Sequence, residues 1–452
     1  MARSPRVDVP TQEEFDALVE RVTHLEEVTE DQELRISELE GDVEEPEPPG
    51  EGVQAKRVCD ALGVFGVNTF SSLDPDANLW GSWPADYSPP SVIHALDFLT
   101  WGTGHSFRIR EYHYASRAQM QIDWIEDIQA SLPQTRFSMC VGANGSVDDA
   151  ASLSKFQDAV NWLEGLNEPN TDFGSGQVPF ATTVSIQQAL QSSRLPLMGP
   201  SIVAGMPHPE GWIEKYCGTP ENLTFLNSLM SIGNGHFYPP DHPDAAGTSL
   251  AEYVGGLCTA YTNNPIALTE YHPSLFNGHG RAPGQEGWDG ERDAYYTLCA
   301  LFRAAKCSVN GLWWYALFDY GSTYVCGLFP QGHANNPRPA ATALRNLYRI
   351  CADTGADNRT FAPGRLDLVV TAPPEVGWDL YQASDGRFFI AIWHSQREPG
   401  GEGVPISIRL HAAPSGLRIH DLVTNTGHSE TPPPTDITLE LCGRAVIVEI
   451  TP

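Results

Sequence analysis

Three hydrophobic patterns follow one another along the chain, and each predicts a different kind of element. Near the N-terminus, apolar residues recur at steps of three and four, the spacing of a coiled-coil seam. In the middle, short apolar runs alternate with amphipathic stretches, and toward the C-terminus apolar and polar residues alternate with a period of two. The last period is that of a half-buried strand. We therefore expect a coiled coil, an α/β domain and a β domain, in that order.

The N-terminal pattern predicts association between copies of the chain. Its seam consists of Phe15, Leu18, Val22, Leu25, Thr29, Gln32, Ile36, Leu39 and Val43. In this register Arg21 and Arg35 lie at g positions, and Glu26 and Glu40 lie at the e positions that face them in a parallel pair. We expect a homo-oligomer, either a dimer or a trimer, held through residues 15–43. A single amphipathic helix packed on the rest of the chain is the alternative.

Composition marks the boundaries between the segments. Residues 44–57 are acidic and rich in proline, which predicts a linker without a core of its own. Residues 1–43 are therefore assigned to the coiled coil, residues 58–357 to the α/β domain and residues 358–452 to the β domain.

The α/β segment repeats a strand followed by a helical stretch. Short apolar runs predict eight strands, at residues 64–70, 106–112, 136–143, 162–168, 196–203, 233–239, 265–271 and 311–319. Eight such units are typical of a (β/α)8 TIM barrel. A doubly wound sheet is the structural alternative, but the residues after the first strand lack the glycine-rich phosphate loop that it requires. The seven short alternating runs that follow predict a C-terminal β-sandwich.

Charge and cysteine usage exclude several classes of partner. The net charge of −30 would repel phosphates, so nucleic acid is not expected as a partner. The chain has no run of about 18 apolar residues, so no membrane helix is expected. Nine scattered cysteines without a CxxC pair support neither a disulfide framework nor a zinc site. Together with an N-terminus that lacks an apolar leader, they favour assembly in a reducing compartment.

Two carboxylates stand where predicted strands end. Glu168 ends the fourth strand in GLNEPN, and Glu270 lies near the end of the seventh in ALTEYHP. The C-terminal ends of TIM-barrel strands carry the active site, so both side chains are expected to face one cleft. Cleavage of a glycosidic bond needs such a pair: one carboxyl group protonates the leaving oxygen, and the other attacks the anomeric carbon or activates water.

These motifs resemble those of glycoside hydrolase clan A, the retaining (β/α)8-barrel glycosidases. The resemblance rests on Asn167-Glu168-Pro169 on strand four, Thr269-Glu270 on strand seven, HFYP on strand six and a tryptophan on strand eight. It covers the whole predicted barrel, and the sandwich that follows makes family 39-like enzymes the closest match. Clan membership implies a covalent glycosyl-enzyme and retention of anomeric configuration.

The resemblance implies a role for each matching residue. Glu168 would be the general acid/base and Glu270 the nucleophile. Asn167 would hydrogen-bond the sugar 2-hydroxyl. Tyr238 would hydrogen-bond Glu270 and keep it ionised, and His236 would line the same subsite, unless it is an ordinary core histidine.

Two further roles leave alternatives open. Arg108 resembles the strand-two arginine that holds the nucleophile side of the site, but Arg110 has the same side-chain parity. Trp314 resembles the strand-eight tryptophan that forms the floor under the sugar, with Trp313 as the alternative. Each of these could instead be a structural ion pair or a core aromatic.

The surroundings of the two carboxylates suggest a cleft for glycans without a metal. Aromatic residues that follow predicted strands could stack on sugar rings: Trp80, Trp83, Tyr112, Tyr114, Tyr271 and Trp288. The glycine- and proline-rich loop 272–292 is expected to cover the cleft. The histidines nearby lack the spacing of a metal-binding motif, so we expect no metal and no cofactor.

The sequence thus favours a retaining glycoside hydrolase that cleaves a polysaccharide or oligosaccharide. The alternative is a non-catalytic glycan-binding or structural fibre protein on a glycosidase scaffold. A coiled coil, no leader and scattered cysteines favour a virion-attached depolymerase that contacts other virion proteins. A bacterial enzyme exported by a non-classical route, or a cytoplasmic one, is the rival interpretation.

Overall fold

The computed structural model describes most of the chain after residue 51. The described residues are 52–70, 88–101, 107–113, 115–143, 145–171, 177–203, 208–239, 249–262, 264–272, 290–319, 326–330, 333–394 and 403–452. Residues 53–452 form one compact unit. The predicted coiled coil and most of the predicted linker lie outside the described residues, so oligomerisation through residues 15–43 stays a prediction.

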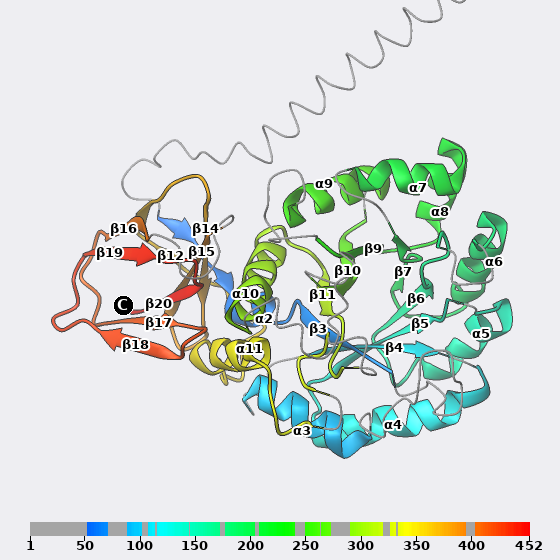
Figure 1. The fold of residues 1–452 in the computed structure, drawn as a ribbon, viewed down its shortest axis with the longest axis horizontal. Coiled ribbons are helices and arrows are strands. Elements are labelled where there is room, and N and C mark those ends of the chain that lie inside the picture. Colours follow the sequence, from blue (N-terminus) through cyan, green and yellow to red (C-terminus); the bar gives the residue numbers. More distant parts are fainter. Residues whose placement is uncertain are drawn as a thin grey trace, which may run out of the picture. The chain divides into compact units, whose positions relative to one another are not determined.

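Parallel strands close into a barrel, which confirms the predicted (β/α)8 fold (Figure 1). Its strands are β3 (Phe65–Thr69), β4 (Arg108–His113), β5 (Arg136–Val141), β6 (Trp162–Leu166), β7 (Leu197–Met198), β8 (Ile202–Val203), β9 (Gly233–Phe237), β10 (Ile266–Tyr271) and β11 (Gly311–Trp314). The sheet order is β7-β6-β5-β4-β3-β11-β10-β9-β8. β7 and β8 occupy one strand position, because Met198 pairs with Ile232 and Ser201 pairs with Asn167.

Helices surround the strands on the outside (Figure 1). They are α2 (Val58–Leu62), α3 (Pro89–Thr100), α4 (Ala118–Ser131), α5 (Val147–Ser152), α6 (Phe180–Leu190), α7 (Pro209–Cys217), α8 (Pro220–Ser228), α9 (Leu250–Ala260), α10 (Gly290–Lys306) and α11 (Pro339–Ile350), with 3-10 turns η2 (Ala115–Arg117) and η3 (Leu153–Phe156). Capping boxes begin α5, at Ser146 and Asp149, and α9, at Ser249 and Glu252. Along the described part of the chain, every helix is too short or too polar to span a bilayer.

The interior of the barrel is filled by side chains. A cluster of apolar residues occupies the level of the strand starts: Met198, Ile232, Ala267 and Trp313, with Trp162 packed against them. Buried polar residues occupy the level toward the strand ends: Asn68, Arg110, Glu164, Asn234, Thr269 and Glu270. Since buried polar groups are costly unless they are hydrogen-bonded, this polar layer marks the functional end of the barrel.

The C-terminal strands form the predicted β-sandwich. Its sheets are β13-β16-β19 and β18-β17-β20-β15-β14-β2, with a separate pair β1-β12. The strands are β1 (Val53–Gln54), β2 (Lys56–Arg57), β12 (Arg365–Leu366), β13 (Leu368–Thr371), β14 (Val376–Gln382), β15 (Phe388–His394), β16 (Val404–Leu410), β17 (Gly416–Asp421), β18 (Thr426–Ser429), β19 (Asp436–Leu441) and β20 (Val446–Thr451). β1 and β2 lie inside the stretch predicted as linker, so the segment that precedes the barrel pairs with the domain that follows it.

The helix α10 joins the barrel to the sandwich. Tyr295 on α10 is wholly buried, and its hydroxyl bonds both backbone groups of His394 on β15. It donates to the carbonyl oxygen and accepts from the amide nitrogen at 3.1 Å. Phe302 on the same helix packs against Trp393, with ring centroids 5.6 Å apart. A single hydroxyl therefore satisfies two buried backbone groups at the domain interface.

Replacing Tyr295 with phenylalanine is expected to lower the free energy of unfolding by about 2–3 kcal/mol, because two buried backbone groups lose their partner. Urea unfolding measures the change. The matched control is Tyr261→Phe, since the Tyr261 hydroxyl is buried without a hydrogen-bond partner among the described residues. That change should alter stability by less than about 1 kcal/mol. Equal losses in both variants would contradict the role given to Tyr295.

Candidate active site

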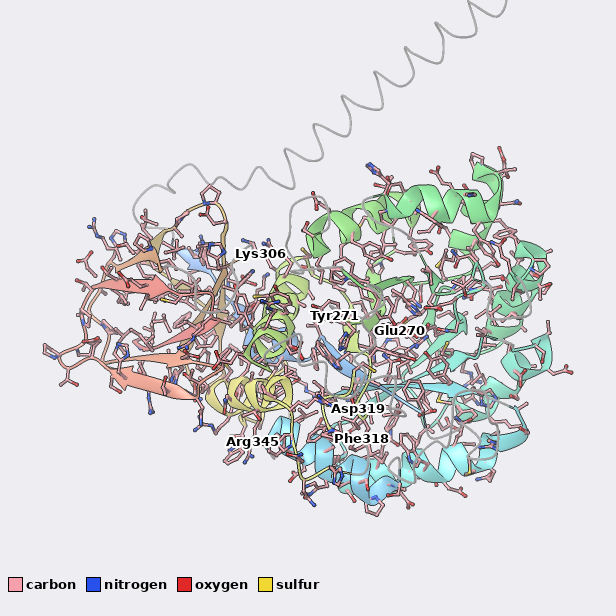
Figure 2. All side chains as sticks on the ribbon, viewed as in Figure 1. Glu270, Tyr271, Lys306, Phe318, Asp319 and Arg345 are labelled. Carbon is pink, nitrogen blue, oxygen red and sulfur yellow. The ribbon has the colours of Figure 1, made fainter. Side chains whose placement is uncertain are left out.

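Glu168 and Glu270 lie together at the C-terminal end of the barrel strands. Glu270 lies on β10, and Glu168 follows the end of β6 by two residues. Figure 2 labels Glu270 inside the ring of helices. The two side chains are nearly buried, with residue exposures of 8% for Glu168 and 3% for Glu270. A carboxylate oxygen of each and a ring nitrogen of His236 all lie within 4.8 Å of one another.

The backbone at Glu168 is strained. Its φ of 45° lies in the left-handed region, which is unfavourable for a residue with a side chain. Its amide nitrogen donates to the carbonyl of Ser201 at 3.1 Å, and its carbonyl accepts from Thr171. Strain of this kind persists only where the surroundings impose it, and it is concentrated at functional sites.

Glu270 is surrounded by hydrogen-bond donors. Its Oε1 accepts from the Arg110 guanidinium at 2.8 Å and from the Tyr112 hydroxyl, and its Oε2 accepts from the Tyr238 hydroxyl. Burial raises the pKa of both tyrosines well above the usual value, so the hydroxyls stay protonated. Burial opposes ionisation of Glu270, but attraction to His236 and Arg110 and the two tyrosine bonds outweigh it. They hold the Glu270 pKa below its ordinary value.

Glu168 is shifted in the opposite direction. Burial and the neighbouring Glu270 charge raise its pKa, against the effect of the 2.6 Å hydrogen bond that its Oε1 makes with Nδ1 of His236. Two nearby carboxyl groups whose pKa values move apart are the usual arrangement of an acid and a nucleophile. The site can therefore hold one protonated and one ionised carboxyl group at the same pH.

The arginine that reaches Glu270 is Arg110, so the expectation that Arg108 holds this side of the site is wrong. Arg108 lies at the opposite end of the barrel, where its guanidinium bonds the carbonyl of Gly63 at 2.6 Å. It also stacks on Trp162 and on Trp313, at 4.9 and 5.5 Å from the ring centroids. Two residues along a strand correspond to roughly 6.6 Å, which separates the strand start from the site.

A buried glutamate that the sequence analysis did not single out anchors Arg110. Glu164 on β6 accepts from Arg110 at 2.6 and 2.7 Å, and it also accepts from Asn234 at 2.9 Å and Thr269 at 3.1 Å. Both partners of the ion pair are wholly buried. The sequence does contain a signal for this residue, since Glu164 is an acidic residue inside the otherwise apolar run WLEGL. A charge in a buried strand needs a buried partner of opposite charge, so its presence predicts an arginine or lysine nearby.

Asn167 has a defined side-chain orientation. Its Oδ1 accepts from Arg110 at 2.7 Å and from the Ser201 hydroxyl at 3.2 Å. A guanidinium can only donate, so the amide oxygen must face Arg110. The NH₂ group of Asn167 is therefore the end of the amide that is left to donate elsewhere in the site.

Of three consecutive aromatic residues at the end of β11, only Tyr315 is partly exposed. Trp314 is 2% exposed, and its indole N–H donates to the carbonyl of Cys326 at 3.0 Å. Its ring packs against His272, with centroids 4.7 Å apart. Trp313 is wholly buried over Arg108, whereas Tyr315 lies edge-on to Tyr238 at 6.4 Å. The geometry thus favours Tyr315 over Trp314 beside the two carboxylates.

Glu168, His236 and Glu270 are also close enough to be considered as metal ligands. Both oxygens of Glu270, however, already accept from Arg110, Tyr112 and Tyr238. A guanidinium 2.8 Å from the carboxylate would repel a cation. The donor set therefore fits a proton donor and a nucleophile better than it fits a metal ion.

The other aromatic residues that were expected to line the cleft fall into two groups. Trp80, Trp83, Tyr114 and Trp288 lie outside the described residues, as does most of loop 272–292. Tyr271 is wholly buried, and Tyr112 is nearly buried and bonds the carboxylate of Glu270.

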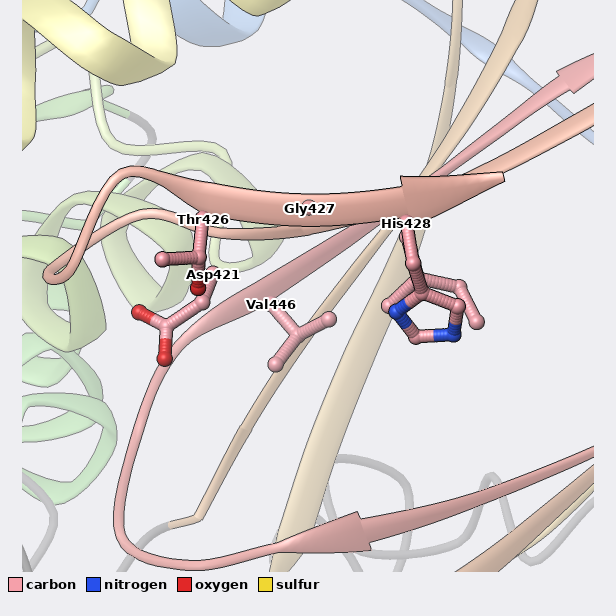
Figure 3. Close-up of a pocket in the computed structure, with 6 residues that line it drawn as sticks. Asp421, Thr426, Gly427, His428 and Val446 are labelled. Carbon is pink, nitrogen blue, oxygen red and sulfur yellow. The ribbon is translucent and has the colours of Figure 1, made fainter.

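A separate hollow of about 240 Å³ lies on the sandwich, between β17, β18 and β20 (Figure 3). It is lined by Ile419, Asp421, Thr426, Gly427, His428 and Val446. The carboxylate of Asp421 is held by Arg444 at 3.0 Å and by the backbone of Val423 and Thr424. With that carboxylate occupied and no Phe, Tyr or Trp among the lining residues, the hollow has neither a free acid group nor a broad aromatic face on which a sugar could stack.

Several solved structures similar in fold to this chain are glycoside hydrolases. A 4-O-α-L-rhamnosyl-β-D-glucuronidase from Fusarium oxysporum 12S has 12% identity and a TM-score of 0.48, over 89% of this chain and 98% of that one. A glycoside hydrolase family 17 β-1,3-glucanosyltransferase from Rhizomucor miehei has 13% identity and a TM-score of 0.43, over 62% and 97%. α-Galactosidase I from Mortierella vinacea has 10% identity and a TM-score of 0.40, over 88% and 98%. No family model and no curated protein matches the chain.

Proposed function

We propose that this chain is a retaining glycoside hydrolase with Glu168 as general acid/base and Glu270 as nucleophile. The observation that carries the proposal is that one carboxylate oxygen of Glu168 and one of Glu270 lie within 4.8 Å of each other, with pKa values that move in opposite directions. Retention is associated with a separation of roughly 5–5.5 Å, whereas inversion needs roughly 6.5–9.5 Å to admit a water molecule. The short separation favours direct attack by Glu270.

The proposed reaction has two steps. In the first, Glu270 attacks the anomeric carbon while Glu168 gives its proton to the departing oxygen. In the second, Glu168 takes a proton from water, and the water oxygen displaces Glu270 from the sugar. The NH₂ group of Asn167 is placed to donate to the sugar 2-hydroxyl, a contact that strengthens in the transition state.

The substrate proposed is a polysaccharide or oligosaccharide, and the enzyme is proposed to act as a homo-oligomer through residues 15–43. We further propose attachment to a virion, as a depolymerase that contacts other virion proteins. These proposals rest on the sequence pattern of residues 1–43. Electron microscopy of purified virions labelled with an antibody against this chain would test the location.

A glycan panel with product analysis by NMR tests the proposed activity. We expect release of reducing sugar from at least one glycan, with the first-formed product in the anomeric configuration of the substrate. An inverted first product would contradict the assignment of Glu270 as nucleophile. Binding of a glycan without any release would instead favour the non-catalytic glycan-binding interpretation.

Replacing Tyr315 with alanine is expected to lower kcat/KM about 10-fold, because a sugar ring would lose its stacking surface, at a cost of about 1.4 kcal/mol. Initial rates at low substrate concentration measure this loss. Trp314→Phe is the control, since it keeps an aromatic ring at the buried position while it removes the N–H that bonds Cys326 and one ring of the indole. A larger loss in that control than in the Tyr315 variant would restore the original prediction that Trp314 forms the floor.

A further inference from the structure

The two oxygens of Glu270 have different surroundings, and this difference assigns them different tasks. Oε2 lies 3.4 Å from Nδ1 of His236, and the same nitrogen lies 2.6 Å from Oε1 of Glu168. Oε1 accepts from Arg110 and Tyr112, which both lie on β4. Oε2 is therefore the oxygen on the acid/base side, and Oε1 is the oxygen on the β4 side.

Tyr112 is held firmly at Oε1. Its ring stacks on Phe70, with centroids 5.5 Å apart and an interplanar angle of 11°. The guanidinium of Arg110 lies 4.7 Å from the Tyr112 ring centroid, and its Nη1 donates to the Tyr112 hydroxyl at 2.9 Å. Since the hydroxyl accepts from Arg110, its own proton is free to point at Oε1. A donor held in this way needs no rearrangement when charge on Oε1 changes.

We propose that Glu270 attacks through Oε2 and that Tyr112 is a further catalytic residue, whose hydroxyl stays bonded to Oε1 and assists hydrolysis of the glycosyl-enzyme. This inference rests on the proposed retaining mechanism. It changes the role of Tyr112 from a stacking surface for sugars to a donor for the reacting carboxylate.

The two steps use Oε1 differently. In the first step the Oε2–C1 bond forms, the bond from C1 to the leaving oxygen breaks, and the proton of Glu168 moves to that oxygen; Oε1 becomes the carbonyl oxygen of an ester. In the second step water bonds to C1, its proton moves to Glu168, and the electron pair of the C1–Oε2 bond returns to the carboxylate. Negative charge then grows on Oε1, where preorganised donors stabilise it.

Tyr238 provides the contrast, because its hydroxyl bonds Oε2. Once Oε2 is bonded to the sugar it carries no negative charge, so the Tyr238 bond acts before the ester forms, when it helps to keep Glu270 ionised for the attack on the anomeric carbon. Loss of the Tyr112 hydroxyl should therefore slow breakdown of the ester, and loss of the Tyr238 hydroxyl should slow its formation.

The test follows a trapped ester by intact mass spectrometry. Wild type, Tyr112→Phe and Tyr238→Phe are incubated with a panel of 2-deoxy-2-fluoro-glycosyl fluorides of common hexoses and pentoses, in both anomeric forms. The excess probe is removed and loss of the adduct mass is followed with time. We expect Tyr112→Phe to lose the adduct about 10-fold more slowly than wild type, since one of two donors to Oε1 is gone. Tyr238→Phe should lose it at nearly the wild-type rate but form it more slowly.

Three other results would overturn either the role of Tyr112 or the proposed function as a whole. Equal breakdown rates in wild type and Tyr112→Phe would overturn the role of Tyr112 and leave the proposed function standing. A Tyr112→Phe protein that is folded by circular dichroism but forms no adduct would place Tyr112 in the first step, which also overturns the inference. Failure of every probe to label the wild type, together with no release from the glycan panel, would overturn the proposed function and this inference with it.

Discussion

Replacing Glu270 with glutamine is expected to lower kcat/KM about 10⁴-fold or more, in line with the loss seen when a catalytic nucleophile is removed. Glutamine has the shape of glutamate, so the hydroxyls of Tyr112 and Tyr238 keep a neighbour of the same size. The neutral amide, however, is a poor nucleophile for the anomeric carbon. Initial rates on the best glycan of the panel measure the loss, and the adduct of the fluoro-sugar probes should be absent from this variant.

The matched control for Glu270→Gln is Glu214→Gln. Glu214 lies on α7 and is exposed, so this substitution makes the same change of charge far from the polar layer of the barrel. Its kcat/KM should stay within about 2-fold of wild type, as expected for a surface substitution. Residual activity of Glu270→Gln above about 1% of wild type would mean that another group attacks the sugar.

Replacing Glu168 with glutamine is expected to lower kcat/KM about 10²- to 10⁴-fold on glycans, the usual contribution of general acid–base catalysis. The loss should be much smaller on an aryl glycoside with a nitrophenol leaving group, because such a group departs without a proton. Added azide should restore breakdown of the ester in this variant, since azide attacks the anomeric carbon without needing a base. Steady-state rates with both kinds of substrate, with and without azide, measure these effects.

The pH dependence provides an independent check on the same assignment. Activity requires Glu270 ionised, and its lowered pKa places the acidic limb of kcat/KM below the ordinary glutamate pKa of about 4.3. Activity also requires Glu168 protonated, and its raised pKa places the alkaline limb above that value. The alkaline limb should vanish in Glu168→Gln. If it persists, it belongs to a group other than Glu168, and the assignment of Glu168 as the acid is contradicted.

The sequence predicts the barrel well because each strand leaves a local signal. A buried parallel strand is a short apolar run between turn residues, and all eight predicted runs are strands of the barrel. Strands without such an apolar run are not predicted from the sequence. β18 (Thr426–Ser429) contains no large apolar residue, is exposed throughout and is held by its backbone pairing with β17. The short strands β1 and β2 lie within residues 44–57, the segment predicted as a linker, and their partners β12 and β14 are about 300 residues away in the chain.

The same distinction applies to the site. The local pattern of the chain is enough to predict that acidic residues stand at the ends of strands four and seven. It follows that Glu168 and Glu270 share one end of the barrel, because strand order and direction can be read from the same pattern. It could not choose between Arg108 and Arg110, since alternate residues of a strand share one face. The choice between the two arginines required the contacts made in the folded barrel. How far along the barrel axis each arginine side chain lies depends on how neighbouring strands are staggered. The same stagger brings Glu164 and Glu270 to the level of Arg110.

The roles of the aromatic residues likewise follow from contacts that exist only in the folded barrel. Trp314 and Tyr315 are adjacent in the chain, and their exposure depends on what packs on each side of β11. Tyr112 could equally have stacked on a sugar, and its bond to Oε1 of Glu270 arises only because β4 and β10 face each other across the barrel. Residue type and strand position are local properties of the chain, whereas contacts across the barrel are made by residues far apart in sequence and exist only once the barrel has closed.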